Sequence, residues 1–238
     1  MWADSILGIS TLTGAGLLDP NIRAAVFDVG ETLMDDSTFW GSWADWLGVP
    51  RHTLSVLVGV VTALGQDNAD ALRLIKPGFD LATERAAREA AGHGESITDT
   101  DLYPDARPAL AALQSAGLWV GIVGNQTARA GQLLRTLDLP ADAIATSGEW
   151  GVTKPDPRFF EHVCTWAGYR AEQIVYIGDH RDNDIIAARD AGLHTAHIRR
   201  GPWGYQFAHD PALHAAATWR IESLAELPEL LGPTTSTR

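Results

Sequence analysis

Short apolar runs recur along the chain, and each ends in a polar or glycine-containing turn that is followed by a helical pattern. The runs occupy residues 24–27, 118–123, 143–146, 174–177, 195–198 and 217–221. Apolar residues are consecutive within them rather than alternating, which is typical of strands buried on both faces of a parallel sheet. Helical patterns lie between them, at 105–116, 127–137, 157–168 and 182–191. This alternation predicts an α/β fold with a doubly wound, Rossmann-like parallel sheet.

Residues suited to helix ends mark the limits of these helical segments. Asp156 is followed by Pro157, so an N-cap acid precedes a proline at the first helical position. Gly117, Gly168 and Gly192 stand where helix C-termini need a residue in the left-handed conformation. The end signals therefore agree with the predicted order of strands and helices.

Residues 35–103 interrupt the alternation directly after the first strand. This stretch has helical patterns without a convincing strand, so we expect an inserted all-helical cap over the end of the sheet. Trp40, Trp43 and Trp46 recur at three-residue spacing and share one helix face. We interpret this face as the packing core of the cap, and the alternative is that a tryptophan edge faces a cavity.

We therefore divide the chain of 238 residues into four parts. The parts are an N-terminal extension at 1–21, an α/β core made of 22–34 and 104–231, a helical cap at 35–103, and a disordered tail at 232–238. The extension lacks a basic region typical of a signal peptide, so we expect a cytoplasmic protein.

Composition removes several classes of protein. Eighteen basic residues against 30 acidic ones give a net charge of −12, which disfavours a nucleic-acid partner. Cys164 is the only cysteine, so the chain can form no internal disulfide or cysteine-based metal cluster. No run of about 18 apolar residues is present, so we expect no membrane span. The sequence gives no signal for an oligomeric state.

Polar residues follow four of the predicted strands at the same topological place. Asp28 follows the first run, Gly124 and Asn125 follow the second, Lys154 lies shortly past the third, and Asp179 follows the fourth. In open α/β sheets the reactive crevice lies at the carboxyl ends of the strands. Their recurrence there indicates a functional site.

The motifs around these residues resemble a known family. Phe27-Asp-Val-Gly-Glu-Thr-Leu33, Gly124-Asn125, Lys154-Pro155-Asp156-Pro157 and Gly178-Asp-His-Arg-Asp-Asn-Asp184 are similar to the four ordered motifs of the haloacid dehalogenase superfamily. The similarity spans residues 22–231 and includes a helical insertion after the first motif. The resemblance implies a hydrolase with a helical cap, and most such members are phosphatases.

The resemblance also implies roles for individual residues. Asp28 would be the nucleophile that attacks phosphorus and forms an aspartyl-phosphate. The implied ligands of Mg²⁺ are the carboxylates of Asp28 and Asp179 and the backbone carbonyl of Gly30. Asp184 would complete the metal site by holding a coordinated water, or would orient Lys154. Lys154 would neutralise the nucleophile and the charge that develops on the phosphoryl group.

Gly124, Asn125 and Lys154 are the implied contacts of the substrate's phosphate. Related phosphatases usually carry Ser or Thr where this chain has Gly124. Backbone N–H groups there could still bind an anion, more weakly and with more room. The implied partner is a small phosphorylated metabolite.

A second departure concerns the proton donor for the leaving group. Related phosphatases usually carry a second aspartate where this chain has Gly30. Protonation of the leaving oxygen is worth about 10²–10⁴-fold, so activity would be weak or restricted to good leaving groups. Alternatively, Glu31, His180 or a cap residue donates the proton. His180 could also contact substrate, or be a structural loop histidine.

Other functions remain as alternatives. A catalytically impaired binding or regulatory protein would explain Gly30 and Gly124. A dehalogenase of the same fold would not need a metal-binding pair such as Asp179 and Asp184. A phosphonatase would need a Schiff-base lysine, and Lys76 is the only lysine of the cap.

Overall fold

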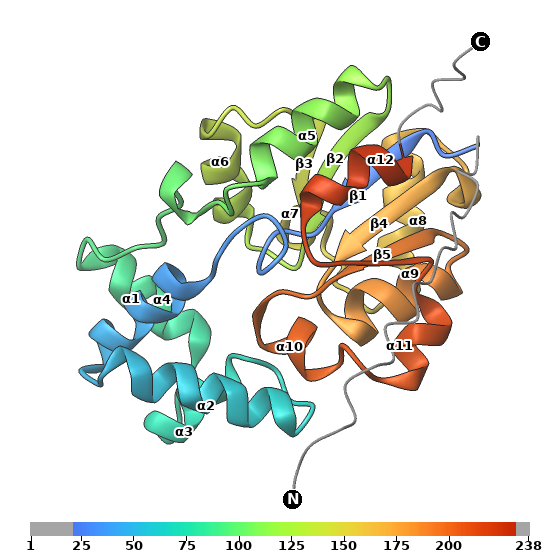
Figure 1. Ribbon diagram of the computed structural model, residues 1–238. Helices are drawn as coiled ribbons and strands as arrows, with labels where there is room; N and C mark the ends of the chain where they lie inside the picture. Colours follow the sequence, from blue (N-terminus) through green and yellow to red (C-terminus); the bar gives the residue numbers. More distant parts are fainter. Residues whose placement is uncertain (1–20, 232–238) are drawn as a thin grey trace, which may run out of the picture.

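The computed structural model describes residues 21–231, and at its centre is one sheet of six parallel strands (Figure 1). The strands are β1 (Ala24–Phe27), β2 (Trp119–Gly124), β3 (Ala143–Thr146), β4 (Ile174–Gly178), β5 (His194–Ile198) and β6 (Trp219–Ile221). Their order across the sheet is β3-β2-β1-β4-β5-β6. The predicted α/β fold with a doubly wound sheet is confirmed. Apart from residue 21, the predicted extension and tail lie outside the described residues.

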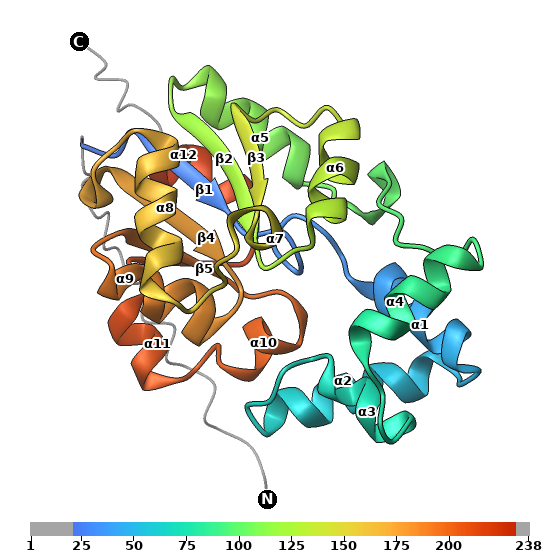
Figure 2. The same ribbon diagram turned by 180° about the vertical axis from the view of Figure 1, so that it is seen from behind.

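Both faces of the sheet are covered by helices, which explains the consecutive apolar residues in the strands. Phe27 packs on one face against α5 (Ala106–Ser115) and α12 (Leu227–Leu231). Its neighbour Val26 packs on the other face against α8 (Pro157–Ala167). Figures 1 and 2 show these helices on opposite sides of the strands. Because successive side chains of a strand point to opposite faces, burying both faces requires both residues to be apolar.

The remaining helices of the sheet region are short. They are α6 (Ala128–Thr136), α7 (Ser147–Trp150), η2 (Ala171–Gln173), η3 (Arg181–Ile186), α9 (Ala187–Asp190), α10 (Gly201–Gln206), α11 (Pro211–Ala216) and η4 (Leu224–Glu226). The helix predicted over 182–191 is in fact a π-helical turn, η3, followed by one α-helical turn, α9. This turn follows β4 directly and carries part of the candidate site.

The predicted helix ends agree with the structure. The Asp156 side chain accepts a hydrogen bond of 2.9 Å from the backbone N–H of Arg158, which caps α8. Gly117, Gly168 and Gly192 have φ values of 86°, 75° and 87°. These backbone angles lie in the left-handed region that favours glycine.

Four α-helices lie between β1 and α5 and form the helical insertion. They are α1 (Ser37–Leu47), α2 (Arg51–Ala63), α3 (Asp70–Ile75) and α4 (Leu81–Ala90), and a 3₁₀ turn, η1 (Asp99–Asp101), follows them. The insertion has an apolar core of its own, in which Trp43 is buried and Trp40 and Trp46 are partly buried. Figures 1 and 2 show it beyond the carboxyl ends of the strands. The packing role of the three tryptophans is confirmed.

The longest helix in the described part of the chain is α2, with 13 residues. A helix needs about 20 apolar residues to cross a bilayer. None of the helices between residues 21 and 231 meets that length and apolarity.

Candidate active site

Three aspartates meet at the carboxyl ends of β1 and β4. Asp28 directly follows β1, Asp179 follows β4, and Asp184 lies in η3. One carboxylate oxygen from each lies within 4.8 Å of the others, and all three side chains are buried. Residues far apart in the sequence are brought together because β1 and β4 are paired in parallel and end at the same edge.

Lys154 connects two of these aspartates. Its Nζ lies 2.7 Å from Oδ1 of Asp28 and 2.5 Å from Oδ1 of Asp184. Burial alone lowers the pKa of an amine, but the charges of Asp184 and Asp28 outweigh burial here and raise the pKa of Lys154 well above its usual value. The ammonium is therefore charged at neutral pH.

The pKa values of two of these carboxyl groups are raised. Burial, opposed by Lys154 and assisted by Asp184, raises the pKa of Asp28 from 3.8 to about 6. Burial and the charges of Asp184 and Asp28 raise the pKa of Asp179 well above its ordinary value. Three carboxylates face one ammonium, so full ionisation leaves two negative charges uncompensated. A divalent cation would compensate them, and oxygen donors of this kind suit Mg²⁺.

Two glycines at strand ends make space for the buried carboxylates. A Cβ atom on Gly124 would lie 2.3 Å from Oδ1 of Asp28, and a Cβ atom on Gly178 would lie 2.3 Å from Oδ2 of Asp184. Both distances are far below van der Waals contact. The extra room that the sequence suggests at Gly124 is therefore filled by the Asp28 carboxylate.

Asn125 holds the loop that carries Lys154. Its Oδ1 accepts a 2.8 Å hydrogen bond from the backbone N–H of Lys154, and its Nδ2 donates one of 3.0 Å to the backbone carbonyl of Lys154. The Asn125 side chain also lines the pocket. Its contact with substrate stays a prediction, and so do the phosphate contacts of Gly124 and Lys154.

Gly30 lines the same pocket, and the Asp36 carboxyl packs against it. A Cβ atom on Gly30 would lie 2.8 Å from Oδ2 of Asp36. Burial, followed by the charges of Glu31 and Asp28, raises the pKa of Asp36 well above its ordinary value. A carboxyl group thus occupies the space into which a side chain at residue 30 would project. The Gly30 carbonyl stays a predicted metal ligand.

Glu31 also lines the pocket and is held in an unusual backbone conformation, with φ of 52°. It accepts a 2.6 Å hydrogen bond from the Tyr103 hydroxyl, and burial raises the pKa of its carboxyl. Glu31 therefore remains a second carboxyl beside Gly30, although its role as proton donor stays a prediction.

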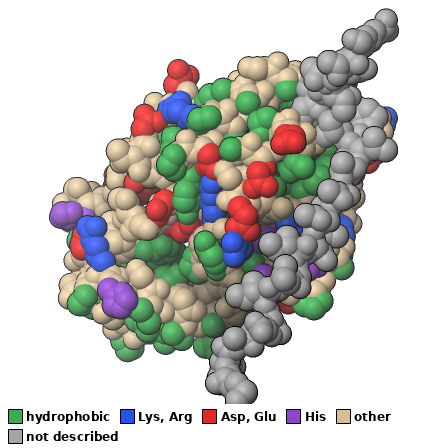
Figure 3. All heavy atoms as spheres, viewed as in Figure 1, with side chains coloured by type: hydrophobic (Ala, Val, Ile, Leu, Met, Phe, Trp, Pro, Cys, Tyr) green, Lys and Arg blue, Asp and Glu red, His purple; other side chains and the backbone are tan. Residues whose placement is uncertain are grey.

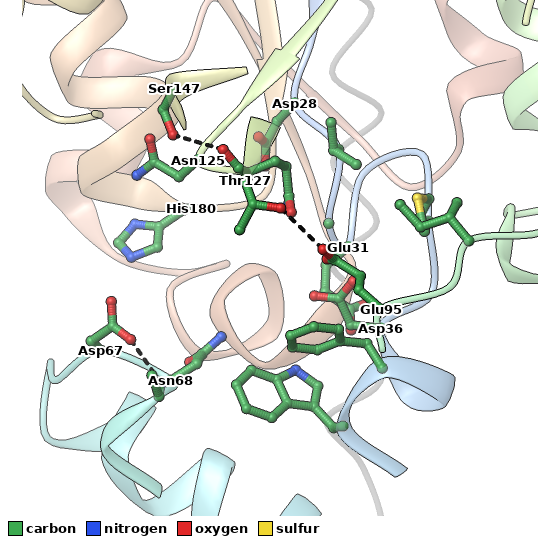
Figure 4. Close-up of a pocket in the computed structure, with 18 of the residues that line it drawn as sticks. Asp28, Glu31, Asp36, Asp67, Asn68, Glu95, Asn125, Thr127, Ser147 and His180 are labelled. Atoms are coloured by element: carbon green, nitrogen blue, oxygen red, sulfur yellow. Dashed lines mark hydrogen bonds between the residues drawn. The ribbon is translucent and has the colours of Figure 1, made fainter. Parts of the chain in front are cut away.

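A pocket of about 490 Å³ extends from the aspartates to the helical insertion (Figure 4). The sheet region contributes Asp28, Asn125 and His180 to its lining, and the insertion contributes Trp40 and Asn68. Trp40 thus faces the cavity as well as the apolar core of the insertion. The tryptophan face therefore forms part of the packing core of the insertion and also has an edge that faces a cavity.

Among the pocket residues that were not predicted from the sequence are Asp36, Asn68 and Trp203. Asp36 stands next to Asp35 directly before α1, and this acidic pair near the first motif was the available signal. Asn68 and Trp203 lie in segments without any recognisable motif. Only the contact between the insertion and α10 in the structure identifies them as pocket residues.

Two cations outside the pocket, Lys76 and Arg199, are engaged in ion pairs. Lys76 pairs with Glu84 on the surface of the insertion and does not line the pocket, so the phosphonatase alternative lacks its lysine there. Arg199 pairs with Glu222, with 2.6 Å between the charged groups. Figure 3 shows acidic and basic side chains side by side in the middle of one face, a distribution that permits such pairs.

Comparisons with known proteins agree on the family. A family model for haloacid dehalogenase-like hydrolases matches residues 22–192. The chain is 34% identical over 206 residues to glyceraldehyde 3-phosphate phosphatase of Methanopyrus kandleri, with 76% of this chain and 86% of that protein covered. It is 30% identical over 236 residues to (S)-2-haloacid dehalogenase 1 of Pseudomonas sp. (strain CBS-3), with 90% and 98% covered.

A solved structure shows the same fold. The crystal structure of a dehalogenase superimposes with a TM-score of 0.67 at 24% identity, and the match covers 91% of this chain and 100% of that one. The family model covers well over half of the chain, and the two relatives are matched along most of their length. The protein therefore belongs to the haloacid dehalogenase-like hydrolases.

Proposed function

We propose that the protein is a Mg²⁺-dependent phosphatase that acts on a small phosphorylated molecule through an aspartyl-phosphate on Asp28. The observation that carries the proposal is the charge of the site: three buried carboxylates within 4.8 Å of one another and one lysine ammonium. A phosphate ester is itself an anion, so it can approach Asp28 only with added positive charge. A divalent cation supplies that charge, and the oxygen donors of the site suit it.

Each residue of the site has a separate part in this reaction. Asp28 attacks phosphorus, the leaving oxygen departs, and water then hydrolyses the aspartyl-phosphate, so that Asp28 is regenerated. Lys154 stabilises the charge on the phosphoryl oxygens, and Asn125 fixes the backbone that carries Lys154. Asp28, Asp179 and Asp184 would hold Mg²⁺, which supplies charge neutralisation when bound.

The glycine at residue 30, two positions after Asp28, determines which leaving groups we expect to react fastest. Gly30 has no side chain to protonate the departing oxygen, and such protonation is worth about 10²–10⁴-fold. Aryl and acyl phosphates, whose leaving groups need little protonation, should therefore react much faster than alkyl phosphates. A flat dependence on the leaving-group pKa would contradict this expectation and make Asp36 the first donor to examine.

The proposal is tested by Mg²⁺-dependent hydrolysis of p-nitrophenyl phosphate. Asp28→Asn should lower turnover by about 10³-fold or more, because the amide is a poor nucleophile. Asp190→Asn is the matched control, because Asp190 is exposed and pairs only with Arg189 at the surface. Undiminished turnover in Asp28→Asn refutes the assignment. Mg²⁺ binding without turnover of any ester would favour a binding or regulatory protein.

Dehalogenation is the second candidate, because one dehalogenase relative is matched over 90% of this chain. Its reaction would bring an anionic haloacid to Asp28 beside Asp179 and Asp184, without added positive charge. We therefore expect no chloride release from 2-chloropropionate. Chloride release without Mg²⁺ would make this the better proposal.

A further inference from the structure

The Asn68 amide has a fixed orientation at the insertion side of the pocket. Its Oδ1 accepts hydrogen bonds from Nε1 of Trp203 at 2.9 Å and from Oγ1 of Thr62 at 3.1 Å. An indole N–H can only donate, so the atom it contacts must be the amide oxygen. The Nδ2 group, with two hydrogens, then has no hydrogen-bond partner among the described residues. Figure 4 shows the Asn68 side chain pointing into the pocket.

The His180 ring has a fixed tautomer on the opposite side of the same pocket. Its Nδ1 accepts hydrogen bonds from the backbone N–H groups of Asp182 at 3.1 Å and Asn183 at 3.2 Å. Backbone N–H groups only donate, so Nδ1 carries no hydrogen and the neutral ring has its hydrogen on Nε2. Figure 4 shows the ring facing the cavity. His180 thus presents one N–H donor to a bound molecule.

Trp203 contacts both Asn68 and His180. Its ring stacks on His180 with 4.0 Å between centroids and an interplanar angle of 28°. The same indole donates to Asn68, and Phe207 stacks on it with 5.7 Å between centroids. Trp203 is 7% exposed and lies in α10, which packs against α2 of the insertion. One buried side chain therefore sets the orientation of a donor on each side of the pocket.

We propose that Nδ2 of Asn68 and Nε2 of His180 donate hydrogen bonds to uncharged oxygen atoms of the substrate's leaving group, and that Trp203 positions both. This inference rests on the proposed phosphatase function and adds the chemical class of the substrate: a phosphorylated polyhydroxy compound, either an acyl phosphate or an ester. Both donors are neutral groups, so they recognise hydroxyl or carbonyl oxygens rather than a second phosphate.

The surroundings of the two donors favour hydroxyl groups. The insertion and the chain after it also place Asp67 and Glu95 in the pocket lining, together with Arg85 as a cation. This part of the pocket therefore has no excess of positive charge for a second anionic group. A hydroxyl accepts from Asn68 or His180 and can donate to a carboxylate, so it satisfies both kinds of neighbour.

The experiment compares two phosphates that differ only in their hydroxyl groups. Propyl phosphate and 2,3-dihydroxypropyl phosphate have the same three-carbon chain and are titrated calorimetrically into Asp28→Asn protein in Mg²⁺. We expect the diol to bind about tenfold more tightly, as two modest hydrogen bonds predict. Binding is measured without turnover, so the result does not depend on which residue is the nucleophile.

The affinity for the diol divided by the affinity for propyl phosphate should fall from about tenfold to about threefold or less in variants of Asn68, His180 or Trp203. Asn68→Leu has nearly the same shape but removes the donor, and it brings no charge to which a hydroxyl could donate. His180→Asn keeps a side-chain acceptor for the backbone N–H groups and removes Nε2. Trp203→Phe keeps a ring against His180 and loses the bond to Asn68. Trp219→Phe, outside the pocket, is the matched control and should preserve the ratio.

The outcomes separate this inference from the proposed function. Equal affinity for the two phosphates in the parent protein, or an unchanged ratio in Asn68→Leu and His180→Asn, overturns the inference. If Trp203→Phe does not fold, those two variants still decide it. The phosphatase assignment fails on a different measurement, namely retained p-nitrophenyl phosphate turnover in Asp28→Asn.

Discussion

The two sides of the pocket differ in charge and in the way their side chains are held. On the sheet side, Asp28, Lys154 and Asp184 are buried and bound to one another through ionic hydrogen bonds. On the insertion side, Trp40 and Phe39 present aromatic rings, and Asn68 is held by neutral hydrogen bonds. Buried ion pairs therefore hold the side chains of the sheet side, whereas neutral hydrogen bonds hold the amide of Asn68 on the insertion side.

Under the proposed function, this difference assigns the reaction to the sheet side of the pocket and the choice of substrate to the insertion side. The two relatives, one named for a phosphatase and one for a dehalogenase, are 34% and 30% identical to this chain, so overall identity does not distinguish their reactions. Under the proposed function, the charges at the sheet edge favour a phosphatase, because Asp179 and Asp184 add carboxylates beside Asp28.

The largest effect should come from removing the cation on the sheet side. Lys154→Met leaves Asp28 and Asp184 without their ammonium, and we expect p-nitrophenyl phosphate turnover to fall by about 10³-fold or more. Lys76→Met is the control, because Lys76 is the other lysine of the chain and lies on the surface of the insertion. Similar losses in both variants would contradict a special role for Lys154.

Crowding at the strand end should have the next largest effect. Gly124→Ala places a Cβ atom 2.3 Å from the present position of Oδ1 of Asp28, so the carboxylate must turn away from Lys154. Misplacement of about 1 Å costs about 10²-fold in rate, and we expect a loss of that order. Gly59→Ala, in α2 with no atom within 4 Å of the new Cβ, should keep full activity. Full activity in Gly124→Ala would show that the Asp28 carboxylate does not need this position.

Mg²⁺ bound at the sheet side should stabilise the folded protein. At 100 times its dissociation constant a ligand adds about 2.7 kcal/mol to the free energy of unfolding, which corresponds to a rise in Tm of about 5–10 °C for a chain of this size. Thermal unfolding with Mg²⁺ and with EDTA measures the shift. In Asp179→Asn the shift should shrink, and an equal shift in that variant would place the ion elsewhere.

The smallest predicted effect is the pH dependence of stability without metal. Asp28 has a pKa of about 6 in the fold and an ordinary value of 3.8, so the folded protein binds the extra proton between these values. The stabilisation is complete below about pH 4 and is lost as the pH rises through about 6. In EDTA, Tm should therefore fall a few degrees more from pH 4 to pH 7 in the wild type than in Asp28→Asn. Parallel curves would contradict the raised pKa.

Much of the sheet side could be predicted from the sequence because its signals are local. Phe27 and Val26 are both apolar because both faces of the sheet are covered, and the turn after each strand carries the polar residue. The parallel pairing of β1 with β2 and β4 then brings Asp28, Gly124 and Asp179 to one edge. A family resemblance could therefore be assigned from short motifs at strand ends.

The insertion side could not be predicted in the same way. Asn68 and Trp203 are separated by 135 residues and meet through a single hydrogen bond between the insertion and α10. Neither residue belongs to a periodic pattern, and asparagine in a loop is common for reasons of turn geometry alone. The Asp36 contact with Gly30 was likewise hidden, because it depends on how the chain turns into α1.

The tight fit at the end of β2 also constrains how this chain can diverge. A Gly124→Ser exchange would restore the hydroxyl typical of related phosphatases, yet its Cβ would collide with Asp28 before the hydroxyl could bind anything. Such a step becomes tolerable only after the Asp28 carboxylate has taken another rotamer. The glycine and the aspartate conformation are therefore interdependent, so a side chain at residue 124 and the present Asp28 rotamer exclude each other.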